Sequence, residues 1–572
     1  MTRRATRSSA LFVALVLAAG CAGKDNTSSS ETPATDGGTP STAADASASS
    51  SGDSSETPAA TATTAAEVLP SPTTPAATAE VDEVTWATYR EANTLDPIYA
   101  FDYPENTVIS AMCESLLLQQ PDGSLAPGLA TLTRPDETTM VFTLRDGVTF
   151  SDGSPLTADD VVFSLQRQMD PSLAGFYGAA FSRVASIEAT GPAEVTITLS
   201  QPDYWLEGEL ASMGGIVLSK AFVEAAGPAY GTPDGGALCT GAFQLDSWSP
   251  GDSISLVRND TYWNGPAKVG RINVVGVPDE AALTSALLTG DIDGSYIGAL
   301  SAVDRLESDP SLTVTSGPSF ASAALVVSSL DGVLGDVDVR NALSMALDRD
   351  GLISAAFQGN AVAPRALANQ GTWGYAPEVF SAAWDALPEP AQDVDAAREM
   401  VEAAGATGQK LVIATTNEIA TVATMSNAIK AAAEDIGLTV ELQAVSAANY
   451  INLFVDPSAR AGVDGFITVN YPDFADPAAL YATFVLPDGS QNFSGYANPE
   501  IQAALDEARA TADPVARAEL VTQAQALIQQ ELPWIPIANP ATVLVTGSSL
   551  TGAPASFVYM GSPWAAGLGG VG

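Results

Sequence analysis

Residues 394–466 alternate between helix and strand patterns, and this alternation limits the folds open to the chain. Two short apolar runs, Leu411–Thr415 and Leu438–Val445, read as a buried strand and a half-buried strand. The segment Met425–Ile436 between them reads as a helix. Strands joined through a helix pair in parallel with a right-handed crossover, so the sequence predicts an α/β fold.

Length, charge and the absence of histidine narrow the class further. At 572 residues the chain is long enough for about three domains of ordinary size. It has 23 Lys and Arg against 67 Asp and Glu, a formal net charge of −44, which argues against binding of nucleic acid or of anionic lipid through a basic patch. The acidity fits a soluble protein outside the cell, and adaptation to a saline habitat is an alternative. With no histidine, Ser-His-Asp and Cys-His catalysis and every histidine-ligated metal site are excluded.

The first 21 residues are typical of an export signal. A basic start is followed by an apolar run, residues 10–19, that is too short to span a bilayer. Leu17–Cys21 resembles the bacterial lipoprotein box, although Ala18 stands where leucine is usual. On this resemblance Cys21 is lipidated and anchors the mature protein to a membrane. A plain secretory signal with an incidental cysteine is the alternative.

Residues 22–80 are rich in Ser, Thr, Ala and Pro and have almost no large apolar side chain. Such a segment buries too little surface to offset the entropy of its chain, so we expect a disordered tether.

The stretch Phe142–Leu165 predicts a strand, a tight turn and a helix. Thr157 is placed to cap the helix, with Asp160 three residues on, close to a capping box. As a string, this stretch resembles the signature of the family 5 extracellular solute-binding proteins, the peptide- and nickel-binding lipoproteins of ABC importers. Further blocks in the same order, within roughly residues 84–545, also resemble the family: Thr94–Pro97 with a helix ending at Glu114–Leu117, Gly236–Gly265, and a helical block at Val337–Gly359.

The resemblance implies a type II periplasmic-binding-protein fold of the three-domain kind (cluster C). Two α/β lobes would close around a hinge, and an extra α+β domain would carry the signature. The expected limits are 81–116, 236–318 and 533–572 for lobe I, 117–235 for the extra domain, and 319–532 for lobe II.

The function that the resemblance implies is capture of a peptide, or a related amine-bearing solute, for an ABC importer. The lobes would close on the solute and the closed form would dock on the permease subunits, with no bond made or broken. We expect a monomer that needs no cofactor and no metal, binds no nucleic acid, and is held by its lipid at the outer face of the bacterial cytoplasmic membrane.

The block that begins at Asn470 is the most informative candidate site. It follows a strand at Gly465–Val469, and ligands of α/β sheets bind where strands end. On the match to the family, Asp473 takes the position of the aspartate that holds a peptide's α-amino group, and Phe474 takes a tyrosine position. Asn470 stands where tryptophan is usual, and Tyr471 is a substitute for that stacking surface. Asp476 precedes a proline that opens the next helix, so we expect a structural role for it.

The resemblance adds further candidates, because the loop after the first strand reaches the ligand cleft in such proteins; its candidate lining residues are Tyr99, Phe101 and Tyr103. The segment Pro364–Tyr375 is irregular and bears aromatic residues, and loops of that kind often carry recognition, so Trp373, Tyr375 and Arg365 are also candidates. Cys113 and Cys239 lie in elements that the family fold brings near the hinge. We therefore predict a disulfide between them, with two buried free thiols as the alternative.

Other functions stay open on the sequence alone. The family also binds oligosaccharides, metal chelates and opines. These ligands stay possible because Asn470 stands where peptide-binding members usually have tryptophan. An extracellular enzyme that uses only carboxylates is a second alternative, and a receptor that senses a solute without transport is a third. Turnover of a soluble substrate would separate the enzyme from the binding protein.

Overall fold

A computed structural model describes residues 72–297 and 300–572. The predicted signal peptide, Cys21 and the tether up to residue 71 lie outside the described residues. Residues 72–80, which we expected to be part of the tether, are instead attached to the C-terminal segment. Ala79 pairs with Gly570, and the Thr74 hydroxyl donates to the Ala553 carbonyl oxygen at 2.7 Å. The predicted limit at residue 80 is therefore wrong by several residues, because this pairing joins positions far apart in the sequence.

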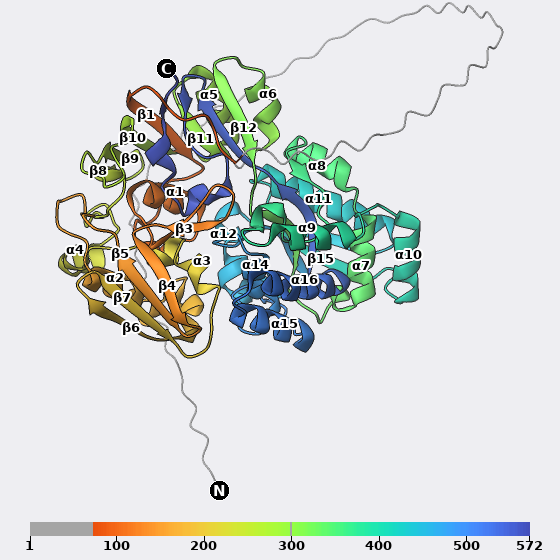
Figure 1. The fold of residues 1–572 in the computed structure, drawn as a ribbon. Helices are drawn as coiled ribbons and strands as arrows, with labels where there is room; N and C mark the ends of the chain where they lie inside the picture. Colours follow the sequence, from red (N-terminus) through yellow and green to blue (C-terminus); the bar gives the residue numbers. More distant parts are fainter. Residues whose placement is uncertain (1–71, 298–299) are drawn as a thin grey trace, which may run out of the picture. The chain divides into compact units, whose positions relative to one another are not determined.

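Seven strands form the first large sheet, in the order β12-β19-β11-β1-β10-β9-β8 (Figure 1). Strand β1 pairs in parallel with β10, with Val84 opposite Ile272, and both of these side chains are fully buried. Its strands are β1 (Val81–Thr88), β8 (Phe243–Ser249), β9 (Ser253–Arg258), β10 (Val269–Gly276), β11 (Gly294–Ile297), β12 (Leu312–Gly317) and β19 (Thr542–Gly547).

Six strands form the second large sheet, in the order β14-β18-β13-β17-β15-β16. The predicted parallel pair is confirmed, because β15 and β16 run parallel with Ile413 opposite Leu442. Every residue of β13 is buried, which is typical of a central strand covered on both faces. The strands are β13 (Ser322–Val327), β14 (Ala361–Val362), β15 (Lys410–Thr415), β16 (Thr439–Ala444), β17 (Gly465–Asn470) and β18 (Trp534–Pro540).

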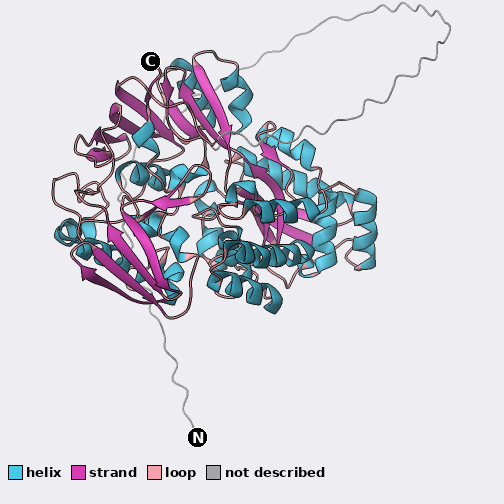
Figure 2. Ribbon diagram, in the orientation of Figure 1, coloured by secondary structure: helices cyan, strands magenta, loops and turns pink. Residues whose placement is uncertain are grey.

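The helices within residues 337–531 lie around this second sheet (Figures 1 and 2). The block at 337–359 is two helices and not one, because Asp348 caps a new helix by accepting from the Gly351 N–H at 2.9 Å. The helices are α7 (Val337–Ala346), α8 (Arg349–Phe357), α9 (Pro377–Ala386), α10 (Val394–Ala403), α11 (Ala420–Asp435), α12 (Ala447–Tyr450), α13 (Asn452–Val455), α14 (Pro477–Val485), α15 (Pro499–Ala510) and α16 (Pro514–Glu531).

The signature stretch lies in a third, four-stranded sheet of order β4-β5-β7-β6 with helix α2 packed on it. The capping box is confirmed: the Thr157 hydroxyl accepts from the Asp160 N–H, and the Asp160 carboxylate accepts from the Thr157 N–H at 3.0 Å. The elements are β4 (Ala130–Asp136), β5 (Thr139–Leu144), β6 (Val184–Gly191), β7 (Glu194–Leu199), α2 (Ala158–Met169), α3 (Leu206–Glu209) and α4 (Lys220–Ala226).

The remaining elements border the first sheet. The helix predicted to end at Glu114–Leu117 ends earlier, because Cys113 is extended and Leu117 already belongs to a strand. The elements are α1 (Tyr103–Met112), α5 (Glu280–Thr289), α6 (Val303–Glu307) and the strand pairs β2 (Leu117–Gln119) with β3 (Leu125–Pro127) and β20 (Leu550–Thr551) with β21 (Gly569–Gly570).

The chain passes between the two large sheets twice. Strand β12 leads into β13 through residues 318–321, and β18 leads into β19 through residue 541. The expected limit at residue 533 assigned both β18 and β19 to one lobe, whereas β18 pairs with β13 in the second sheet. The two crossings touch, since the Thr542 hydroxyl donates to the Pro318 carbonyl oxygen at 3.1 Å.

Candidate ligand-binding site

A narrow cavity lies where the first turn of α1, the loop after β17 and the segment around residue 557 meet. The centre of a water molecule can move within about 10 Å³ of this cavity, so the cavity holds about one water. Residues from six stretches of the chain line it: Asn106, Gln119, Ser212, Met213, Phe320, Tyr471, Pro472, Asp473, Phe557, Val558, Met560 and Gly561. A wider hollow of about 570 Å³ beside α8 is lined by none of the residues predicted for binding.

Asp473 reaches this cavity from the loop that follows β17. Two bonds from one side chain of β2 hold its backbone: the Gln119 amide donates to the Asp473 carbonyl oxygen at 2.9 Å and accepts from the Ala475 N–H at 3.2 Å. The loop is thus fixed to the chain beside the first sheet. The Asp473 carboxylate itself has no hydrogen bond and no ion pair with any residue in 72–297 or 300–572.

The charge near Asp473 is negative, and no ion pair within the described residues neutralises it. Burial raises the pKa of the Asp473 carboxyl to about 6. Burial, followed by the charge of Asp473, raises the pKa of Glu209 well above its ordinary value. Glu209 has no ion-pair partner among the described residues either. Two neighbouring acids without a cation favour a ligand that brings positive charge.

Tyr471 joins the β17 loop to the loop after β1. Its hydroxyl donates to the Phe101 carbonyl oxygen at 3.0 Å. Its ring lies 5.2 Å from the ring of Tyr103 and 4.9 Å from that of Phe557, centroid to centroid. Tyr103 therefore supports a cavity wall through Tyr471.

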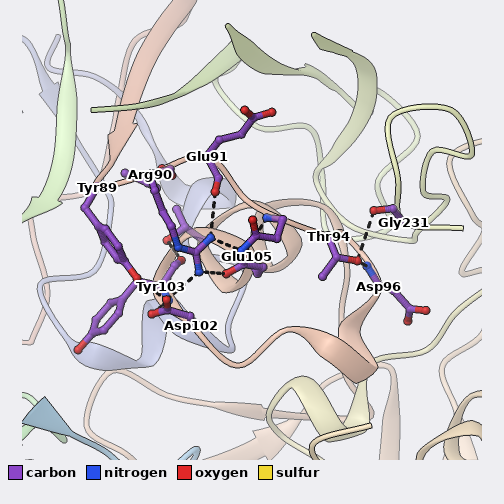
Figure 3. Close-up of polar contacts among 12 residues, drawn as sticks. Tyr89, Arg90, Glu91, Thr94, Asp96, Asp102, Tyr103, Glu105 and Gly231 are labelled. Atoms are coloured by element: carbon purple, nitrogen blue, oxygen red, sulfur yellow. Dashed lines mark hydrogen bonds and ion pairs between the residues drawn. The ribbon is translucent and has the colours of Figure 1, made fainter. Parts of the chain in front are cut away.

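An arginine fixes the loop after β1 (Figure 3). The Arg90 guanidinium donates to both Glu105 carboxylate oxygens, at 2.6 and 2.9 Å, and to the Asp102 carboxylate at 2.7 Å. Asp102 also caps α1 by accepting from the Tyr103 N–H at 2.8 Å and bonds the Tyr89 hydroxyl. The bidentate geometry holds the first turn of α1, and with it Asn106, in one position.

Most of the other predicted residues lie outside the cavity. Tyr99 and Phe101 are exposed, and Phe474 is buried against Gly208, where an added Cβ would lie 2.1 Å from the Phe474 ring. Trp373 packs 6.3 Å from Phe380, and Arg365 pairs with Glu389 at 2.8 Å.

The three remaining candidates, Asn470, Tyr375 and Asp476, form hydrogen bonds within the protein. Asn470 accepts a hydrogen bond from the Gln491 amide at 3.3 Å. Asp476 has the expected structural role: it caps α14 by accepting from the Ala478 N–H at 2.8 Å, and it accepts from the Tyr375 hydroxyl at 3.2 Å.

Comparison with known proteins identifies the family. The profile of the bacterial extracellular solute-binding proteins, family 5, matches residues 124–492, which is more than half of the chain. The chain belongs to this family.

Relatives and solved structures agree with that placement. The periplasmic murein peptide-binding protein MppA of Escherichia coli K12 is 27% identical over 487 residues, which is 80% of this chain and 88% of MppA. The DppA binding protein of Helicobacter pylori, solved with the peptide STSA, superposes with a TM-score of 0.74 at 23% identity, over 86% of this chain and 98% of DppA. The AgaA protein of A. tumefaciens R10, solved with agropinic acid, gives 0.74 at 21% identity, over 86% and 99%.

This family 5 protein has the disulfide that its sequence suggested. Cys113 and Cys239 are bonded, with their Cα atoms 4.9 Å apart. Next to the bond, the buried carboxylate of Glu114 accepts from the Thr240 hydroxyl, the Tyr262 hydroxyl and the Trp263 indole at 2.9, 2.7 and 2.9 Å. The end of α1 is therefore tied to the segment before β8.

Several cavity residues of this family 5 protein were not predicted from its sequence. Asn106, Gln119 and Phe557 carry no motif, and they share the cavity with segments that lie far from them in the sequence, such as the one with Asp473. Glu209 was missed because acidic residues are too frequent in this chain for spacing to single one out. Of the lining residues, Asp473 and Tyr471 were predicted, from the block of acids and aromatics that follows β17.

Proposed function

We propose that this solute-binding protein captures a peptide or a related amine-bearing solute and that Asp473 pairs with its ammonium group. The observation that supports this is the half-buried Asp473 carboxylate, which lines the cavity and has no partner in the described ranges. A charge-assisted hydrogen bond of this kind contributes about 1.5–3 kcal/mol. The peptide-binding relatives support the same ligand class.

Binding would proceed by closure of two lobes, one around each large sheet. The two crossings at 318–321 and 541 are the hinge in this proposal, and the four-stranded sheet with α2 belongs to the extra domain, within 117–235. Because the cavity has room for about one water, a peptide would enter only when the lobes separate. Closure on the ligand then presents the surface that docks on an importer permease.

The protein would work outside the cytoplasmic membrane as a monomer anchored through the lipidated Cys21. Within residues 72–297 and 300–572, none of the helices has both the length and the apolar character of a transmembrane span. Replacement of Cys21 by Ser should release the protein into the medium, and detection of the Cys21→Ser variant in the membrane fraction would contradict the anchor.

A thermal-shift panel on the folded chain tests the ligand class. It would compare peptides with a free amine, their N-acetylated forms, oligosaccharides, metal chelates and an opine. A ligand at about a hundred times its Kd should stabilise the protein by roughly 2.7 kcal/mol. We expect free-amine peptides to raise Tm and the acetylated forms to leave it unchanged.

The matched pair Asp473→Asn and Asp476→Asn tests the residue. Both changes remove one carboxylate from the segment between β17 and α14, but only Asp473 lines the cavity. Asp473→Asn should weaken peptide binding at least tenfold, whereas Asp476→Asn keeps an amide oxygen for its cap and should bind normally. Equal affinity of the two variants would remove Asp473 from the site.

The opine-bound AgaA structure supports a second candidate class, a non-peptide solute. A response to opine, sugar or chelate alone would favour it. Conversion of a bound solute into a product would instead favour a carboxylate-dependent enzyme, which we do not propose.

A further inference from the structure

Asn106 carries a polar atom that the chain leaves without a partner. The residue is 3% exposed and lines the same cavity as Asp473. Its side-chain oxygen Oδ1 is buried. Neither Oδ1 nor the side-chain nitrogen Nδ2 has a hydrogen-bond partner in the ranges 72–297 and 300–572. An unsatisfied buried polar group costs about 1–3 kcal/mol, so its retention points to a partner that arrives from outside the chain.

The position of Asn106 is well determined. It lies in the first turn of α1, where its N–H donates to the Asp102 carbonyl oxygen at 3.1 Å and its carbonyl oxygen accepts from the Ser110 hydroxyl at 2.6 Å. The Arg90 bonds to Asp102 and Glu105 hold that turn (Figure 3). The amide of Asn106 is therefore presented to the cavity by a rigid element.

The surroundings of Asn106 in the cavity are rich in acceptors. Asp473 contributes an unpaired carboxylate, and Glu209 lies close behind: its carboxylate is 3.4 Å from the hydroxyl of Ser212, which lines the cavity. The nearest candidate cation for Glu209, Arg509, is engaged with Asp203 at 2.6 Å. A group that donates several hydrogen bonds and carries positive charge matches this lining, and a primary ammonium has three N–H donors.

We propose that Asn106 is a specificity-determining residue that accepts a second hydrogen bond from the ligand's ammonium group, beside Asp473, so that the site selects primary amines over N-methylated ones. This inference rests on the proposed function. Glu209 adds negative potential without touching the ligand. An N-methyl ammonium keeps two N–H donors, but its methyl group needs space in a cavity that has room for about one water. Bonding to both Asp473 and Asn106 would therefore press the methyl group against the cavity lining.

The ligand would also bridge the two large sheets. Asn106 is on α1, which packs beside the first sheet, and Asp473 follows β17 of the second. An ammonium bonded to both residues stabilises only the arrangement in which they lie close. Recognition of the amine and closure of the lobes are then one event.

Calorimetry with trialanine and trilysine, each free, Nα-methylated and Nα-acetylated, tests the inference. For the wild-type protein we expect the free form to bind about tenfold or more tighter than the N-methyl form, because the methyl group displaces the nitrogen from Asn106 and one hydrogen bond of a charged group is lost. Asn106→Ala removes the acceptor and opens space, so the ratio should fall below about threefold. Asn106→Asp keeps an oxygen acceptor and should preserve the preference, and Asn427→Ala, at an exposed asparagine of α11, is the control.

The outcomes separate the two proposals. If free peptides bind and depend on Asp473, but Asn106→Ala keeps the wild-type ratio, the inference is wrong and the proposed function stands. If Asn106→Ala weakens free and N-methyl peptides equally, the residue has a structural role only, and the inference is again wrong. If the wild-type protein binds neither peptide, the proposed function fails and the inference fails with it.

Discussion

The Asp473 side chain is half-buried, ionisable and unpartnered within the described residues, and this combination is unfavourable for folding. Burial raises its pKa to about 6 from an ordinary value of 3.8, so the folded state binds the proton more tightly than the unfolded state does. The neighbouring acid Glu209 and the phenols of Tyr177 and Tyr471 supply no positive charge. Asp473 thus lowers the stability of the folded state, and it is the residue that we propose binds the ligand.

A pH series on Asp473→Asn checks this. Because the folded pKa is the higher one, ionisation of Asp473 destabilises the wild-type fold as pH rises from about 4 to above 6. The asparagine variant should equal wild type in unfolding free energy near pH 4 and exceed it by about 1–3 kcal/mol near pH 7. Glu209 titrates with the same sign. Denaturant unfolding at each pH measures this difference in unfolding free energy. A difference that stays constant with pH would contradict the burial of this charge.

Ligand affinity should show the opposite trend. An ammonium pairs with the ionised Asp473 carboxylate, so the affinity for free-amine peptides should fall about tenfold for each pH unit below about 6. Calorimetry at pH 5, 6 and 7 measures this, with Asp473→Asn as the variant whose weaker binding should be insensitive to pH. A flat wild-type profile would argue that another group holds the ligand.

Among the elements, the segment between β7 and α3 is joined to α15 by a buried ion pair. The Arg509 guanidinium donates to the Asp203 carboxylate at 2.6 Å and to the Ala180 carbonyl oxygen at 3.1 Å, and Asp203 is 1% exposed in its side chain. Removing one partner leaves a buried charge, so Arg509→Met should cost about 3–5 kcal/mol in unfolding free energy. Lys430→Met is the control, since Lys430 pairs with Glu434 on α11, where the two side chains are 38% and 47% exposed, and should cost less than about 1 kcal/mol. Equal costs would show that burial does not set the strength of this link.

The disulfide is the second link between elements. It closes a loop of 126 residues between the end of α1 and the segment before β8. Its main effect is on the unfolded chain, and replacement of both cysteines by alanine should lower the unfolding free energy by about 2–5 kcal/mol. Reduction of the wild-type protein should lower Tm by the same amount as the double substitution. A reduced wild-type protein with unchanged Tm would show that the bond contributes little.

For the whole molecule, the net charge of −44 has a consequence for stability. Like charges repel more strongly in the compact state, and the Debye length shrinks from about 30 Å at 0.01 M salt to about 10 Å at 0.1 M. Tm should therefore rise when NaCl increases from about 10 to 500 mM. A sucrose series at constant low ionic strength separates screening from general solvent effects. A Tm that falls with NaCl would mean that ion pairs such as Arg509–Asp203 outweigh the repulsion.

Local sequence patterns were sufficient for the elements and the family. The parallel β15–β16 pair, the capping box at Thr157 and Asp160, and the cap role of Asp476 each depend on residues within one short segment. Such features follow from periodicity and from side chains that bond their own backbone, which the sequence displays directly. The helices that were mispredicted, at 113–117 and at 347–348, failed at their ends, where the choice between continuing and capping is small in energy.

The composition of the cavity was decided only by the tertiary structure. Asp473 was named from its motif, but its neighbours Asn106, Gln119, Ser212 and Phe557 come from segments that meet only after the sheets assemble. The same holds for residues 72–80, which pair with the C-terminal segment, and for β18, which joins the second sheet. The sequence alone determined the fold class and the family, and it singled out Asp473 as a candidate for the site. The residues that line the cavity with Asp473 are brought there by contacts between distant segments, and no local pattern encodes those contacts.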